Sequence, residues 1–371
     1  MKIKMLSGLA VGAVLLLVLA GRVVSQNTDA PSPYATLTGD SSVSADDLRA
    51  AIDPLFDRDE NPQIGETRAL LVLHNGKIIA ERYGEGFDAE SRHLSWSVAK
   101  TITGLLVGIM ASDGRLALDD PAPVKAWRQP GDPRAAITLR ELLQMRSGLQ
   151  HTETRGPLEK TDALAMLVGA GAPDQLAYAE SKPLIDKPGT VFNYSSGNSV
   201  ILAGLVTSQL TELTDPKGRR DAMMQFIQAR FSGPLGLKSF APEFDEKGTL
   251  LGGVMIHMTA RDYAKVGEFM RLRGRVGDRQ LLSDRWIDFM TSPSPTNPAY
   301  GGQIWLNREG KDSALFPGEA RRSLFGASGY RGQFILVSPE QKLTVVRLGV
   351  TNESDLPVLR HALARLVRVI P

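Results

Sequence analysis

The sequence contains no cysteine among its 371 residues and few histidines. The first absence excludes disulfides, thiol catalysis, cysteine-ligated zinc and a lipoprotein anchor on cysteine. No His-x-x-x-His pair or carboxylate cluster indicates a metal site, so we expect neither metal nor cofactor. No Gly-x-Ser-x-Gly segment is present, which disfavours a Ser-His-Asp hydrolase. The histidines stand in no recognisable triad context: His74, His93, His151, His257 and His361.

The chain also lacks internal repeats, low-complexity tracts and long blocks of one charge. Its formal net charge is +2, and the leader over residues 1–26 carries Lys2, Lys4 and Arg22 without any acid. Removing these three cations leaves the rest of the chain at about −1, a balance that predicts no nucleic-acid partner. We expect a small-molecule substrate, and oligomeric state is left open.

Residues 1–26 have the composition of an export leader. A positive head is followed by an apolar or small-residue run from Met5 to Gly21, and Val23-Val24-Ser25 is an imperfect cleavage site. The run of about 17 residues also approaches the minimum for a spanning helix, so an uncleaved inner-membrane anchor is the alternative. Either way we expect an exported protein, periplasmic or extracellular. Residues 27–43 are predicted to be a linker, and 44–371 the functional domain.

The order of predicted elements indicates the fold. Two β-prone runs flank Asn75-Gly76, which is the strongest short-range hairpin signal. Helical patterns dominate from Ser97 to about residue 290, strand patterns return at 302–306, 332–337 and 343–349, and a last helix covers 356–369. We therefore expect a two-lobed α/β domain, in which an antiparallel sheet built from both ends and flanked by helices faces a mainly helical lobe across a cleft.

Ser97-Val98-Ala99-Lys100 is the only Ser-x-x-Lys of the chain. On a helix, residues i and i+3 share a face, so the lysine amine can reach the serine oxygen. The positive end of the helix dipole would favour the oxyanions formed in acyl transfer. A lysine acts as a base only if burial or a neighbouring cation favours its neutral form.

Two further segments carry candidate functional residues. Tyr194 stands just before a helix that Ser195 or Ser196 caps, where its hydroxyl can relay a proton. The glycine-rich run Phe325–Gln333 precedes a strand, and amides on such an edge can bind an oxyanion. His151 follows a Ser-Gly-Leu turn and is the histidine best placed to border a cleft.

Ser97-x-x-Lys100, Tyr194-x-Ser196 and Ser328-Gly329 occur in the order and rough spacing of the serine β-lactamase and penicillin-binding-protein superfamily. The chain resembles its class C-related branch of esterases, D-amino-acid peptidases and 6-aminohexanoate-dimer hydrolases. Further sequence segments also resemble this branch: residues 71–81, 137–149, 234–237 and 252–262. The resemblance spans about residues 60 to 365.

This resemblance implies that Ser97 is the acylated nucleophile and that Lys100 and Tyr194 transfer protons, with either as the resting base. It implies an oxyanion hole from the amides of Ser97 and Tyr330. Ser196 replaces the asparagine found in many class C enzymes.

The third motif departs from the Lys-Thr-Gly of true β-lactamases, because Ala327 stands in place of the lysine. Arg331 is nearby, but the pattern does not assign it that role, and Tyr300 and Trp305 are candidates for lining an acyl pocket. We therefore expect a serine hydrolase of small esters or amides. The alternatives are a weak β-lactamase or D-peptidase and a catalytically inactive binding or sensor module.

Overall fold

The computed structural model describes residues 32–154 and 157–371. The predicted leader, residues 1–26, lies outside these ranges. Part of the predicted linker is described, and there Tyr34–Leu37 form strand β1, which pairs antiparallel with β3 (Lys77–Tyr83). The expectation of a linker up to residue 43 is therefore wrong for this segment. Tyr34 is buried and donates a hydrogen bond to Asp53 over 2.6 Å, so the folded unit begins before residue 44.

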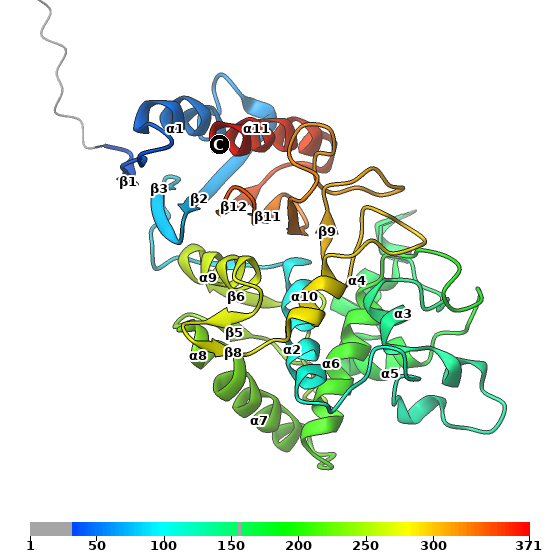
Figure 1. Cartoon of the computed structure of the whole chain (residues 1–371). Helices are drawn as coiled ribbons and strands as arrows, with labels where there is room; N and C mark the ends of the chain where they lie inside the picture. The colour runs from blue at the N-terminus through cyan, green and yellow to red at the C-terminus, as the bar shows by residue number, and fades with distance from the viewer. Residues whose placement is uncertain (1–31, 155–156) are drawn as a thin grey trace, which may run out of the picture. The chain divides into compact units, whose positions relative to one another are not determined.

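Within the described ranges, seven strands form one antiparallel sheet (Figure 1). Three strands come from the start of the folded unit and four from its end, which confirms that one sheet is built from both ends. In spatial order the strands are β1, β3, β2 (Glu66–His74), β12 (Leu343–Val350), β11 (Gln333–Ser338), β10 (Phe325–Gly329) and β9 (Trp305–Leu306).

Smaller strands form two minor sheets: β4 (Arg92–Leu94), β6 (Ile256–Thr259) and β5 (Ala241–Pro242) in one, and β7 (Arg275–Val276) with β8 (Arg279–Gln280) in the other. The helices are α1 (Ala45–Ile52), α2 (Val98–Ser112), α3 (Leu139–Leu143), α4 (Asp162–Val168), α5 (Gln175–Glu180), α6 (Ser196–Leu210), α7 (Pro216–Ile227), α8 (Gly233–Leu235), α9 (Ala260–Arg271), α10 (Asp284–Met290) and α11 (Leu356–Val369). In the part of the chain that is described, no helix combines the length and apolarity needed to span a membrane.

The main sheet is covered on both faces, which explains the unbroken apolar run of β2. Successive side chains of a strand point to opposite faces. Leu71 and Leu73 join the core that contains α2, whereas Leu70 and Val72 join the core beneath α1 and α11. Figure 1 shows α1 and α11 together on one side of the sheet and α9 on the other.

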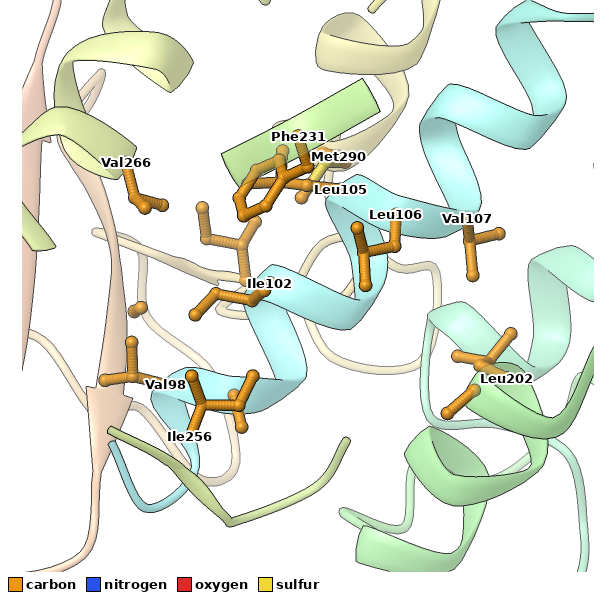
Figure 2. Packing of buried hydrophobic residues seen from close by; sticks show 14 of the residues in the cluster. Val98, Ile102, Leu105, Leu106, Val107, Leu202, Phe231, Ile256, Val266 and Met290 are labelled. Atoms are coloured by element: carbon orange, nitrogen blue, oxygen red, sulfur yellow. The ribbon is translucent and has the colours of Figure 1, made fainter. Parts of the chain in front are cut away.

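Helix α2 is buried from Val98 to Met110, between the sheet and the helical part of the chain. Its side chains share one core with those of α6, α9 and α10, and Figure 2 shows Leu202, Val266 and Met290 among the residues of this core. Each large apolar side chain buried in this way stabilises the fold by about 1.5–3 kcal/mol. The helix that carries Ser-x-x-Lys is therefore a rigid part of the core.

Candidate active site

Ser97 stands at the junction between strand β4 and helix α2. Just ahead of it, the Ser95 amide donates to the carbonyl of Ile256 over 2.8 Å, and the Ser95 hydroxyl donates to the carbonyl of Val254 over 3.1 Å. Trp96 then takes a positive φ of 45°, which is rare for a bulky residue and turns the chain sharply. Ser97 occupies the N-cap position, but its side chain makes no capping hydrogen bond. Its half-buried hydroxyl is therefore available for other chemistry.

Lys100 lies one turn into α2 and is 1% exposed. Its amine donates to the Ser97 hydroxyl oxygen over 3.0 Å, as the Ser-x-x-Lys spacing predicts. Three more oxygens surround the same nitrogen. The Ser196 hydroxyl lies at 2.9 Å, the Gly253 carbonyl at 3.0 Å and a carboxylate oxygen of Glu153 at 3.3 Å.

Tyr194 precedes α6 and lies against the same amine, with Lys100 Nζ 4.9 Å from the centre of its ring. The ring stacks on Trp305, with centroids 5.4 Å apart, and meets the edge of Tyr300 at 5.8 Å. Burial raises the pKa of the Tyr194 hydroxyl, although the Lys100 ammonium and Ser97 act in the opposite direction. Tyr300 and Trp305 are both buried, so they hold Tyr194 in place.

Glu153 is the residue that sequence reasoning missed. One of its carboxylate oxygens accepts from Lys100 and from the Ser196 hydroxyl at 2.6 Å. The other accepts from the Ser196 amide at 2.8 Å and from His151 Nε2 at 2.7 Å. Burial acts to raise the pKa of Glu153, but Lys100 and the donors from His151 and Ser196 outweigh it and hold the pKa well below its usual range. Glu153 is therefore ionised.

The nearby sequence gives little sign of this role, because Glu153 lies in a loop without periodicity. The loop is drawn in by Asn193, whose side chain donates to the His151 carbonyl over 3.0 Å and whose amide donates to the Met145 carbonyl over 2.8 Å. His151, the histidine expected to border the cleft, is buried and bonds to Glu153.

Ser196 contacts Lys100, and the glycine-rich segment lies against the turn that leads to Ser97. The Ser196 hydroxyl is buried and accepts from Lys100 while donating to Glu153. A Cβ added to Gly329 would lie 2.6 Å from the Ser95 carbonyl, so β10 approaches the turn before α2 more closely than a side chain would allow. Ser328 precedes it, half-buried and paired with Phe334 of β11.

Tyr330 follows β10, and its exposed ring meets the edge of Trp96 at a centroid distance of 5.2 Å. This contact places the backbone after β10 next to the residue before Ser97. Among the described residues, neither the Ser97 amide nor the Tyr330 amide donates a hydrogen bond to another part of the chain. Two backbone donors thus stand beside the start of α2.

The sequence and the structure were compared with those of known proteins, and the matches agree with this geometry. The sequence matches the Beta-lactamase family over residues 65–369. The chain belongs to this family. It is 25% identical over 305 residues to a 6-aminohexanoate-dimer hydrolase of Paenarthrobacter ureafaciens, covering 78% of this chain and 74% of that protein.

Two solved structures share the fold. A putative 6-aminohexanoate-dimer hydrolase from Bacillus anthracis superposes with a TM-score of 0.66 at 20% identity, covering 82% of this chain and 80% of that one. A family VIII carboxylesterase superposes with a TM-score of 0.63 at 14% identity, covering 87% of this chain and 96% of that one. The predicted family, the two-lobed α/β fold and the assignment as a serine hydrolase related to the β-lactamases are therefore confirmed.

The third motif reads Ala327-Ser328-Gly329. Ala327 is fully buried in the core that packs on α2, so it supplies no cation to a substrate. Arg331 lies after the end of β10, with a backbone φ of 60°, an amide that donates to Glu353 over 3.2 Å and a guanidinium carbon 6.0 Å from the centre of the Tyr330 ring.

Other features of the described residues lie apart from this cluster. A cavity of about 270 Å³ opens between α9, α10 and the Phe325 end of β10, and none of the candidate catalytic residues lines it. Across the described ranges, no group of three or more His, Asp or Glu side chains is placed to hold a metal ion.

Proposed function

We propose that this member of the Beta-lactamase family hydrolyses small esters or amides through an acyl-enzyme on Ser97. The observation that carries the proposal is the 3.0 Å contact between the buried Lys100 amine and a Ser97 hydroxyl that makes no capping bond. A nucleophile, a proton-transfer pair and oxyanion donors meet at one helix end, which is the arrangement that acyl transfer needs.

In the first step Ser97 Oγ attacks the substrate carbonyl carbon, and its proton passes to the Lys100–Tyr194 pair. The amides of Ser97 and Tyr330 hold the oxyanion, and the pair returns the proton to the leaving group as its bond to the carbonyl breaks. Water then attacks the acyl ester, which releases the acid and restores the Ser97 hydroxyl.

The proposed substrate makes no salt bridge through a carboxylate at the third motif. Ala327 removes the cation expected for binding a β-lactam carboxylate, which argues against efficient turnover of penicillins. The names of the relatives, an amide-dimer hydrolase and a carboxylesterase, support the same substrate classes.

The test is intact mass after brief exposure of a soluble form, beginning near Asn27, to a p-nitrophenyl ester. We expect an acyl adduct on the parent protein and on Ser208→Ala, a control whose hydroxyl bonds only within α6. Ser97→Ala should show none. Absence of both adduct and p-nitrophenol release in the parent would favour an inactive binding module, and faster turnover of a chromogenic cephalosporin than of the ester would favour a β-lactamase.

We further propose that the protein is exported and acts outside the cytoplasm, either released or held at the inner membrane by residues 5–21. The supporting feature is the positive head and apolar run of the leader. Fractionation of cells that express the full chain, with N-terminal sequencing of the product, tests it. A cytoplasmic product that begins at Met1 would contradict export.

A further inference from the structure

We propose that Glu153 is a positioning residue that keeps Lys100 as an ammonium in the resting enzyme and aims it at Ser97. The inference rests on the proposed acyl transfer at Ser97 and decides a question the motifs leave open, namely whether Lys100 or Tyr194 can be the resting base.

The hydrogen bonds around Lys100 Nζ favour its charged form. Two of its neighbours, the Gly253 carbonyl and the Glu153 carboxylate, can only accept. A third, the Ser196 hydroxyl, has one proton, which it donates to Glu153 over 2.6 Å. Toward Lys100 that hydroxyl is therefore an acceptor as well.

With the Ser97 hydroxyl, four oxygens that can accept lie within 3.3 Å of Lys100 Nζ. An ammonium offers them three N–H groups, whereas a neutral amine offers two and turns its lone pair toward one of them. The surroundings therefore favour the charged form.

Charge leads to the same result. The Glu153 carboxylate is ionised and 3.3 Å from Lys100 Nζ. The other groups that face this amine are Ser97 on α2, Tyr194 and Ser196 at the start of α6 and the Gly253 carbonyl, and none of them is a cation. His151 contacts only the far carboxylate oxygen. The nearest full charge is therefore negative, and an opposite charge favours the ammonium.

It follows that the resting Lys100 does not accept the Ser97 proton. The proton that must first leave the Lys100–Tyr194 pair comes from Tyr194, and the Lys100 ammonium then stabilises the phenolate. Glu153 touches neither substrate nor the reacting atoms, so its part is to fix the position and the charge of Lys100.

The experiment is the pH dependence of kcat/KM for a p-nitrophenyl ester, followed at the isosbestic wavelength of the product. Removing the carboxylate in Glu153→Gln makes loss of a proton from the pair easier, so we expect the acidic limb to move down by about one pH unit or more. The optimum rate should fall about tenfold or more because Lys100 is less well placed.

Two variants act as controls. Glu153→Asp keeps the charge and should keep the limb of the parent protein. Glu243→Gln removes another glutamate that bonds a histidine side chain over a similar distance, 2.6 Å to His257, at an exposed position, and should change nothing. An acidic limb of Glu153→Gln that coincides with that of the parent would overturn the proposal.

A direct measurement covers the case in which Glu153→Gln does not fold. In the parent protein labelled with ¹³C at lysine Cε, the Lys100 resonance, assigned by its loss in Lys100→Arg, should be that of an ammonium at pH 7. A neutral amine there would overturn the role of Glu153 while leaving acylation of Ser97 intact. If Ser97→Ala keeps full esterase activity, it is the proposed function that fails.

Discussion

The amine of Lys100 lies 3.0 Å from the hydroxyl oxygen of Ser97 and 3.3 Å from a carboxylate oxygen of Glu153. The lysine thus joins the proposed nucleophile to a buried anion that is 53 residues further along the chain. Removing either partner of such a buried pair leaves an uncompensated charge, which typically costs about 3–5 kcal/mol. This coupling separates the contribution of Lys100 to stability from its contribution to catalysis.

We expect Lys100→Met to destabilise the fold by about 3–5 kcal/mol and to abolish acylation. Adding Glu153→Gln should recover most of the stability but none of the activity, because the lone carboxylate is gone and the amine is still missing. Urea unfolding and ester turnover measure the two effects. Lys265→Met, which removes a lysine paired with Asp262 near the surface of α9, is the control. Additive losses in the double variant would contradict the coupling.

Tyr194→Phe should reduce the acylation rate by about 10²–10⁴-fold, the usual contribution of a general acid or base, while the protein stays folded. The ring keeps its contacts with Trp305 and Tyr300, so only the hydroxyl is lost. Single-turnover kinetics with a p-nitrophenyl ester check the rate. Tyr178→Phe, which removes a hydroxyl bonded to Asp162, should acylate normally. Near-normal acylation by Tyr194→Phe would exclude this residue from the chemistry.

Gly329→Ala tests the close contact between β10 and the Ser95 carbonyl, in the turn that leads to Ser97. The new methyl would lie 2.6 Å from the Ser95 carbonyl, so the strand has to move away from Ser97. We expect kcat/KM to fall about 10²-fold, since a displacement of about 1 Å at a reacting centre has this effect. Gly86→Ala, at a turn where an added Cβ meets nothing within 4 Å, has a positive φ of 79° and should lose some stability but keep activity. Equal activity of Gly329→Ala and the parent would show that the close approach is not needed.

Local patterns predicted much of the fold. The Asn75-Gly76 hairpin, the final helix over Leu356–Val369 and the Ser97–Lys100 contact depend on residues close in sequence, and all three are present. Strand β10 was not predicted as a strand, because glycine and serine disfavour strands; it forms since β9 and β11 pair with it on both sides. Glu153 was missed because its role depends on contacts with Lys100 and Ser196 that no local pattern encodes.

His93 gives the last prediction, which concerns stability against acid. Its side chain is buried on β4, its Nε2 has no hydrogen-bond partner in the part of the chain that is described, and its ring lies 5.6 Å from that of Phe87. Burial, with help from the charge of Arg68, lowers the pKa of His93 from 6.5 to about 4. Below pH 6.5 the unfolded chain therefore binds a proton that the folded chain does not.

The direction in which stability changes with pH follows from this difference in proton binding. The full stability is present above pH 6.5, and it falls as the pH is lowered from 6.5 to about 4, by up to about 1.4 kcal/mol per pH unit from this side chain. Replacing His93 with Phe removes the titrating group, so the free energy of unfolding of His93→Phe should decline less over this window. Urea unfolding at several pH values measures it, with His257→Gln, at a more exposed position, as control. Parallel curves for the parent and His93→Phe would mean that His93 is protonated as readily in the folded protein as in the unfolded chain.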